Sequence, residues 1–164
     1  MNKVIISLVG CENSGKTFVL NQVISFLMQN TAVSKVIRLR DLKDKTYLIH
    51  MNQSLVLITT LGDANKYLQE ELEFAFQETT KPINVIVYAQ RSNKKNKDFP
   101  CIENLIENKT YLKAYSTNQV QSNTNKRKVL YNRESKKIDF LSRNIIDGDF
   151  SKAREIVDEV LNYV

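Results

Sequence analysis

Apolar residues at the start of the chain follow first a strand pattern and then a helix pattern. Residues 4–9 form an apolar run that ends at Gly10, as expected of a strand buried on both faces in the middle of a parallel sheet. From Thr17 onward, apolar residues recur at helical spacing, at positions 19, 20, 23, 24, 27 and 28. The pattern predicts a buried strand, a short loop and an amphipathic helix in succession.

The middle of the chain alternates between further strands and helices. Residues 35–39 are predicted to form a second strand. Two more strands, over 47–51 and 55–59, are joined by the polar turn Asn52-Gln53, which indicates a hairpin. An amphipathic helix with an acidic outer face is predicted over 64–79. The pattern then predicts a strand over 83–89, a short helix over 99–107 and a strand over 111–115.

The remainder of the chain predicts a basic segment followed by closing helices. Residues 118–137 are polar and basic, and we expect a mobile or partly helical excursion there. Helices are predicted over 138–146 and 151–163, with Ser151 as the N-cap of the second. The alternation predicts a single α/β domain over 1–164 with three layers. In it, helices cover both faces of a mostly parallel central sheet that contains one antiparallel hairpin.

Composition limits the class of protein further. The length of 164 residues suits one domain, and 42% apolar with 26% charged residues is typical of a soluble globular chain. No apolar run approaches the roughly 20 residues of a membrane span, so we expect a cytoplasmic protein without membrane contact. Cys11 and Cys101 are expected to be free thiols. The net charge of +6 favours anionic ligands without distinguishing nucleotide from nucleic acid.

The loop between the first strand and the first helix contains a phosphate-binding motif. Residues 10–17, Gly-Cys-Glu-Asn-Ser-Gly-Lys-Thr, satisfy the pattern G-x-x-x-x-G-K-[ST] at every defined position. A pattern with so few defined positions also occurs by chance. Here it stands directly after a buried strand and directly before an amphipathic helix, which is the setting that phosphate binding requires. We therefore expect the loop to bind the phosphates of a Mg²⁺-bound nucleoside triphosphate.

Each defined residue of this motif has a chemical role. Gly10 and Gly15 permit backbone torsions that let successive N–H groups curl around the β-phosphate. Lys16 supplies a positive charge to the β and γ oxygens, and the Thr17 hydroxyl is suited to coordinate Mg²⁺. The positive N-terminal end of the helix points to the same phosphates. The predicted nucleotide-binding residues are Gly10, Cys11, Glu12, Asn13, Ser14, Gly15, Lys16, Thr17 and Phe18.

A second acidic group that holds the metal usually follows a neighbouring strand. The nearest candidate is Asp63, at the end of the segment 59–63, Thr-Thr-Leu-Gly-Asp, a few residues after an apolar strand. Asp63 is equally suited to be the N-cap of the helix that begins at Ala64. The two roles are compatible, so Asp63 is a candidate metal ligand and catalytic residue.

Three segments together resemble a group of small P-loop NTPases, a nucleotide-kinase-like group of Walker A ATP-binding proteins. They are the loop 10–17, the segment 59–63 and the segment 89–92, Ala-Gln-Arg-Ser, which ends a later strand. The resemblance covers the chain only up to this last segment, and it implies a three-layer P-loop NTPase fold. It also implies that Asp63 positions the metal or a water molecule and that Arg91 faces the bound nucleotide.

Arg91 also has an argument of its own. An arginine after a strand is most often a solvated surface residue, but the carboxyl edge of an open α/β sheet is where the ligand crevice lies. A guanidinium there can bind a phosphate with two hydrogen bonds or stabilise charge during transfer. The predicted catalytic residues are therefore Lys16, Asp63 and Arg91, and the predicted metal ligands are Thr17 and Asp63.

Base identity and reaction type are less constrained. Guanine-specific GTPases use N-K-x-D, and residues 93–98 contain these letters without that spacing, so ATP is expected. The reaction is ATP hydrolysis, with Asp63 or Glu12 orienting water, or phosphoryl transfer to a small molecule or nucleotide under a basic lid over 126–137. A non-catalytic nucleotide sensor or a nucleic-acid-associated accessory protein is the alternative. Asp41 is a further candidate for substrate contact, whereas His50 is expected to be a packed or edge residue.

Overall fold

The computed structural model describes residues 3–10, 15–41, 44–61, 65–91, 113–119 and 150–164 of the chain. The elements in chain order are β1 (Val4–Gly10), α1 (Lys16–Met28), β2 (Val33–Asp41), β3 (Lys45–Met51), β4 (Ser54–Thr59), α2 (Asn65–Gln77), β5 (Val85–Arg91), β6 (Lys113–Gln119) and α4 (Ser151–Leu161). The helices expected over 99–107 and 138–146, and the basic segment beyond Gln119, lie outside the described residues.

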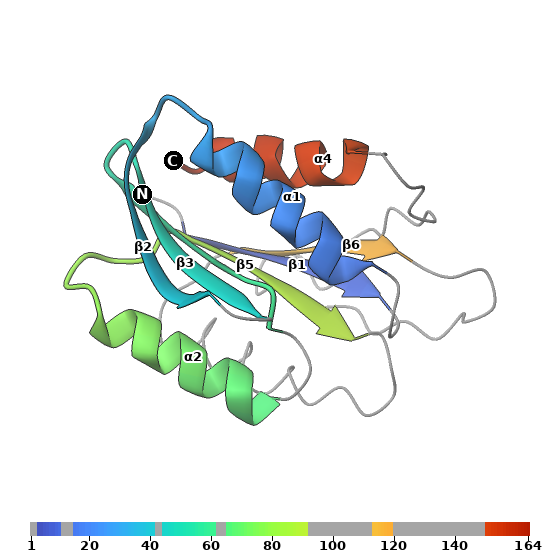
Figure 1. The fold of residues 1–164 in the computed structure, drawn as a ribbon, viewed down its shortest axis with the longest axis horizontal. Helices are drawn as coiled ribbons and strands as arrows, with labels where there is room; N and C mark the ends of the chain where they lie inside the picture. Colours follow the sequence, from blue (N-terminus) through green and yellow to red (C-terminus); the bar gives the residue numbers. More distant parts are fainter. Residues whose placement is uncertain (1–2, 11–14, 42–43, 62–64, 92–112, 120–149) are drawn as a thin grey trace.

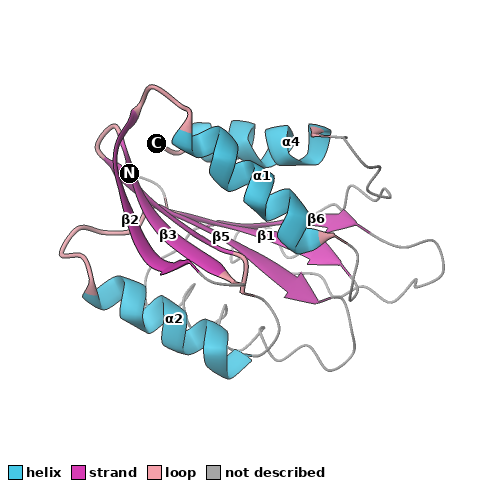
Figure 2. Cartoon of the chain, viewed as in Figure 1, coloured by secondary structure: helices cyan, strands magenta, loops and turns pink. Residues whose placement is uncertain are grey.

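The described strands form one six-stranded mixed sheet in the order β2-β3-β4-β5-β1-β6. β1 pairs parallel with both β5 and β6, and β4 pairs parallel with β5. β3 pairs antiparallel with β2 on one side and with β4 on the other. Helices α1 and α4 lie over one face of the sheet, and α2 lies over the opposite face (Figure 1, Figure 2).

The expected three-layer P-loop NTPase fold, with a mostly parallel sheet and a single hairpin, is wrong. An antiparallel meander of β2, β3 and β4 makes up one side of the sheet, so the sheet is mixed. The physical reason is the length of the connection after β2, which consists of residues 42–44 only. A parallel pairing needs a crossover of about a dozen residues or more, so a connection this short fixes β2 and β3 as antiparallel neighbours.

Two local predictions had different outcomes. The hairpin of β3 and β4 is confirmed, and its turn residue Asn52 has a positive φ of 52°, a conformation that asparagine tolerates. The prediction that Ser151 is the N-cap of α4 is wrong, because Phe150 occupies that position and no side chain caps the helix. Ser151 is instead the first helical residue.

The central strands bury side chains on both faces, and successive residues alternate between two apolar clusters. On β5, for example, Val85 and Val87 belong to the cluster under α1 and α4, whereas Ile86 and Tyr88 belong to the cluster under α2. This alternation follows from the two-residue period of a strand. It explains why β1, β4 and β5 are rich in apolar residues at successive positions rather than at every second one.

Candidate functional site

The carboxyl ends of four parallel strands lie at one edge of the sheet. β1 ends at Gly10, β4 at Thr59, β5 at Arg91 and β6 at Gln119. β2 and β4 both pair antiparallel with β3, so β2 runs in the same direction as β4. The last residue of β2, Asp41, therefore also lies at this edge. In α/β sheets, ligands bind in the crevice outside the carboxyl ends of the strands, so this edge is the candidate site.

The connection from β1 to α1 brings a helix N-terminus to the same edge. Gly15 has φ 88° and ψ 17°, the left-handed conformation that is open to glycine at little cost, and this confirms the expected special torsion at Gly15. The first hydrogen bond of the helix runs from the N–H of Val19 to the carbonyl oxygen of Gly15, at 3.0 Å. The amides of Lys16, Thr17 and Phe18 therefore have no acceptor within α1.

The first three residues of α1 differ in exposure. The side chain of Lys16 is buried, whereas Thr17 and Phe18 are exposed. The charge of Lys16 adds to the partial positive charge at the N-terminal end of α1. This end of the helix combines a cation, backbone donors and an exposed hydroxyl, a set that suits a polyphosphate with its metal ion.

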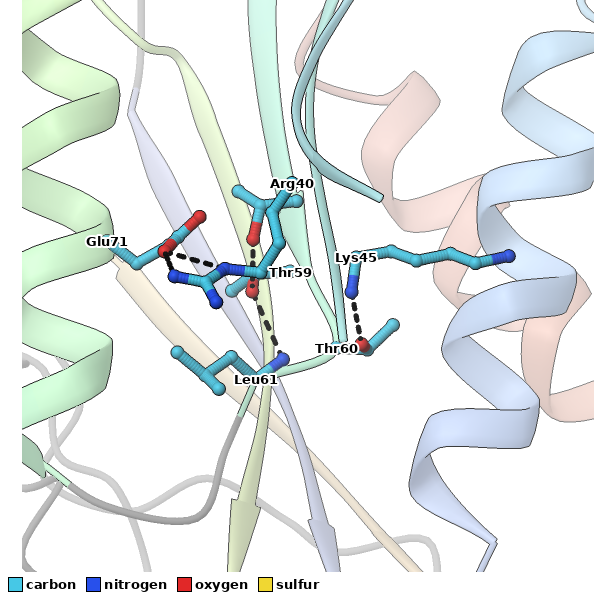
Figure 3. A network of polar contacts seen from close by, with 7 residues as sticks. Arg40, Lys45, Thr59, Thr60, Leu61 and Glu71 are labelled. Carbon is cyan, nitrogen blue, oxygen red and sulfur yellow. Dashed lines mark hydrogen bonds and ion pairs between the residues drawn. The ribbon is translucent and has the colours of Figure 1, made fainter. Parts of the chain in front are cut away.

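Hydroxyl groups line the end of β4 (Figure 3). The Oγ1 atoms of Thr59 and Thr46 are 2.9 Å apart and buried, and Thr59 Oγ1 also accepts a hydrogen bond of 3.1 Å from the N–H of Leu61. Thr60 pairs with Lys45 in both directions, since its N–H donates to the Lys45 carbonyl oxygen and its Oγ1 accepts from the Lys45 N–H, each at 2.9 Å. These bonds fix the backbone at the end of β4, as far as Leu61.

Cationic side chains extend to opposite faces of the sheet at this edge. Arg40 extends toward α2 and makes an ion pair with Glu71, and the hydrogen bond and the charge of Glu71 raise the pKa of the guanidinium. Lys45 extends to the face that α1 covers (Figure 3). Within the described part of the chain, its ammonium has no anionic partner. Sequence reasoning missed Lys45, although a lysine directly after the short connection 42–44 is the signal that could have found it.

The structure brings together some of the predicted site residues. Gly10 and Arg91 are register partners at the ends of the neighbouring strands β1 and β5, and Lys16 and Thr17 begin α1 at the same edge. Asp41 lies on the edge strand, four strand spacings or about 19 Å across the sheet from β1, so the two ends do not meet. His50 lies near the opposite end of β3, partly buried.

Part of the predicted site lies outside the described residues. Asp63 and residues 11–14 belong to this part, so their roles stay predictions. Among the residues that the structure describes, no group of three or more His, Cys, Asp or Glu side chains could hold a metal ion. The predicted Mg²⁺ site, with Thr17 and Asp63, therefore stays a prediction as well.

The chain has no detected relative that would supply a function. No protein-family model, curated protein or solved structure matches it. None of the helices described has the length and apolar character needed to cross a membrane. The functional argument therefore depends on the loop motif and on the geometry of the carboxyl edge.

Proposed function

We propose that the chain binds a Mg²⁺-bound nucleoside triphosphate, ATP in particular, through the loop 10–17 and the first turn of α1. The observation that carries this proposal is the conformation of Gly15 together with the start of α1 at Lys16. A glycine at the N-cap adopts this left-handed conformation at little cost, and the first amides of a helix have no acceptor within the helix. Backbone donors, a lysine and a threonine hydroxyl at that point are the groups that bind a triphosphate.

Lys16 and Thr17 have separate roles in this proposal. Lys16 binds the β and γ oxygens, and its burial strengthens that interaction because little water screens it. Thr17 is exposed at the helix end, and its hydroxyl is a hard oxygen ligand of the kind that Mg²⁺ prefers. When bound, Mg²⁺ neutralises charge on the β- and γ-phosphates.

We further propose that the bound ATP is hydrolysed. Arg91 ends β5 beside Gly10, which supports a role in stabilising charge on the transferred phosphate. Asp63 follows the last residue of β4, Thr59, by four positions in the sequence, and this short spacing supports a role for Asp63 in orienting the attacking water. Lys45, on the α1 face of the same edge, is a second cation that can attract the triphosphate.

The binding step is tested by replacing Lys16. We expect Lys16→Ala to lower the affinity for MgATP at least tenfold, about 1.4 kcal/mol of binding free energy, with the fold intact by circular dichroism. The matched control is Lys81→Ala, because Lys81 is exposed and lies before β5, away from the carboxyl edge. Removal of Mg²⁺ with EDTA should weaken ATP binding to the unmodified chain. Equal MgATP affinity in the Lys16→Ala and Lys81→Ala variants would contradict the proposal.

The reaction is tested with labelled γ-phosphate. An ATPase releases free phosphate without an added acceptor, a kinase transfers the label to an added small molecule or nucleotide, and a sensor binds ATP with neither result. We expect free phosphate, and we expect Asp63→Asn and Arg91→Ala to slow its release while MgATP still binds. Binding without turnover in the unmodified chain would overturn hydrolysis and leave the binding proposal standing.

A further inference from the structure

Lys35 and His50 lie side by side at the edge of the sheet opposite to the candidate site. They are register partners on the antiparallel strands β2 and β3, so their Cβ atoms are about 4.5–5.5 Å apart. Both side chains lie on the face that α2 covers, because the next pair on that face, Ile37 and Leu48, packs in the apolar cluster under α2. Lys35 is exposed and His50 is partly buried, so a ligand from solvent can reach the pair.

The connection between α2 and β5 brings a third basic side chain to the same place. The N–H of Asn84 donates to the Leu55 carbonyl oxygen at 2.8 Å, and Leu55 is the register partner of His50 on β4. This bond holds the connection beside the start of β4, at the edge away from the arrowheads of β1, β5 and β6 (Figure 1). Lys81, three residues before Asn84, is exposed, and its charge acts on His50 together with that of Lys35.

The charged groups that act on His50 are both positive. Burial lowers the pKa of His50 most, and the charges of Lys35 and Lys81 lower it further. Within the described part of the chain, neither lysine has an ion-pair partner. Like charges directly opposite each other destabilise a sheet. The arrangement is therefore unfavourable until an anion compensates the positive charge.

A lysine on an edge strand also has a simpler role. It discourages pairing of the exposed strand with another chain, and β2 is an edge strand of the described sheet. Arg38 and Arg40 are exposed on the same strand and serve that purpose as well. Blocking an edge does not require a lysine opposite a partly buried histidine, with a second lysine brought near it by another segment.

We propose that Lys35 and His50 bind a dianionic oxyanion, the phosphate group of free phosphate or of a small phosphate ester, with Lys81 adding to the positive potential. This site is separate from the loop 10–17 and does not depend on the proposed function. An ammonium group and a protonated imidazole offer only donors, so the ligand has to supply several acceptor oxygens. The second pKa of a phosphate group is about 6, which makes it a dianion near neutral pH.

Anion binding at this site is coupled to the protonation of His50. The protonated imidazole makes a charge-assisted hydrogen bond to the oxyanion, so bound anion favours the charged form and raises the pKa of His50. This direction is opposite to the effect of the two lysines. Because the chain has one histidine, its imidazole signal reports this site and no other.

The experiment follows the imidazole NMR signal of His50 in the full chain. Sulfate is the first probe, because it stays a dianion over the pH range in which histidine titrates, and sodium chloride at equal ionic strength corrects for screening. We expect sulfate to raise the pKa of His50 and to bind about tenfold more tightly at pH 5 than at pH 8. Lys35→Ala should weaken sulfate binding about tenfold. Arg38→Ala is the matched control, because Arg38 is exposed on the opposite face of β2, with its register partner Tyr47 in the cluster under α1 and α4.

The outcomes decide between a site and general screening. A change in the pKa of His50 no larger in sulfate than in chloride would overturn the proposal, and so would equal weakening of sulfate binding by Lys35→Ala and Arg38→Ala. In the Lys16→Ala variant sulfate should still raise the pKa of His50, and loss of this response would mean that the anion binds at the loop instead. Failure of MgATP binding would leave the response of His50 unchanged. At pH 7, inorganic phosphate and glycerol 3-phosphate, compared on the same signal, show whether the free anion or the ester binds more tightly.

Discussion

Arg40 and Glu71 connect the edge strand β2 to helix α2 through one carboxylate oxygen. Nε and Nη2 of Arg40 donate to Oε2 of Glu71, at 3.1 and 2.8 Å. The carboxylate side chain is 6% exposed, whereas the arginine side chain is 44% exposed. Because Glu71 is almost out of reach of water, its charge depends on Arg40 for compensation. The pair therefore attaches α2 to the meander beside the end of β4.

Removing the guanidinium should destabilise the fold. We expect Arg40→Ala to lower the free energy of unfolding by about 1–3 kcal/mol, the range for a buried charged acceptor that loses its donor. Glu71→Gln should lower the free energy of unfolding by less, because the neutral amide oxygen of glutamine can still accept a hydrogen bond from Arg40. Urea unfolding with an unchanged m-value measures both. Glu78→Gln, at an exposed position after α2, is the control, and a loss as large as that of Glu71→Gln would argue against a special role for the pair.

The buried hydroxyls of Thr46 and Thr59 should contribute as a pair. Their Oγ1 atoms are 2.9 Å apart, and Thr59 also accepts from the N–H of Leu61. We expect Thr46→Val to cost about 1 kcal/mol of stability and Thr59→Val to cost more, since the Leu61 amide then loses its acceptor. The double variant should cost less than the sum of the single ones. Additive losses in this double-mutant cycle would mean that the hydroxyls do not interact.

The sequence was sufficient to predict features that depend on neighbouring residues. The strand β1, the helix α1 and the glycine conformation between them follow from a local apolar pattern and from the steric freedom of Gly15. The turn at Asn52 follows from its own side chain, which tolerates a positive φ. None of these features requires knowledge of the strand order.

Features that depend on strand order were not predicted. The second strand was predicted without a neighbour, although the three residues 42–44 allow only an antiparallel return from β2 to β3. Arg40 and Glu71 are 31 residues apart in sequence, and they meet only because β2 lies at the edge of the sheet and α2 lies on the matching face. Lys45 lies at the candidate site also because of the strand order: β3 runs antiparallel to β2 and β4, so its first residue lies where those two strands end. Apolar periodicity carries no information on which strands become neighbours.

His50 should titrate below the usual range of histidine. Burial lowers its pKa first, and the positive charges of Lys35, its register partner on β2, and of Lys81 lower it further. Lys35→Ala and Lys81→Ala should each raise the pKa of His50. Because the chain has one histidine, a single imidazole signal in an NMR titration reports it. Lys45→Ala, at the other end of β3, should leave that pKa unchanged.

This lowered pKa also sets the direction of a stability change with pH. In the unfolded chain histidine has a pKa of about 6.5, so below that pH the unfolded state binds more protons than the folded state. The contribution of His50 to the free energy of unfolding is fully present above a pH of about 6.5, and it is lost as the pH falls through the lower folded-state pKa. We expect the free energy of unfolding to decline over this interval, and to decline less in Lys35→Ala. A His50 pKa at or above its ordinary value would contradict both expectations.

Asn84 should be among the most sensitive positions of the sheet, because it joins the starts of β1 and β4. Its N–H donates to the Leu55 carbonyl oxygen at 2.8 Å, its Oδ1 accepts from the Leu55 N–H at 3.0 Å, and its carbonyl oxygen accepts from the Val4 N–H at 2.8 Å. Asn84→Ala removes the side-chain acceptor from a buried amide, and we expect a loss of about 1–3 kcal/mol in the free energy of unfolding.

Asn84→Asp distinguishes this hydrogen-bonding role from a loss of volume. The aspartate retains an acceptor for Leu55, but burial disfavours its charge and raises its folded-state pKa above the ordinary value of about 3.9. A raised pKa stabilises the fold below the unfolded value, and this stabilisation is lost as pH rises through the folded one. The variant should therefore be closer in stability to the unmodified chain at pH 4 than at pH 7. Asn52→Asp, in the exposed turn, should show no such difference, and a pH-independent loss in Asn84→Asp would mean that the side chain at this position is not buried.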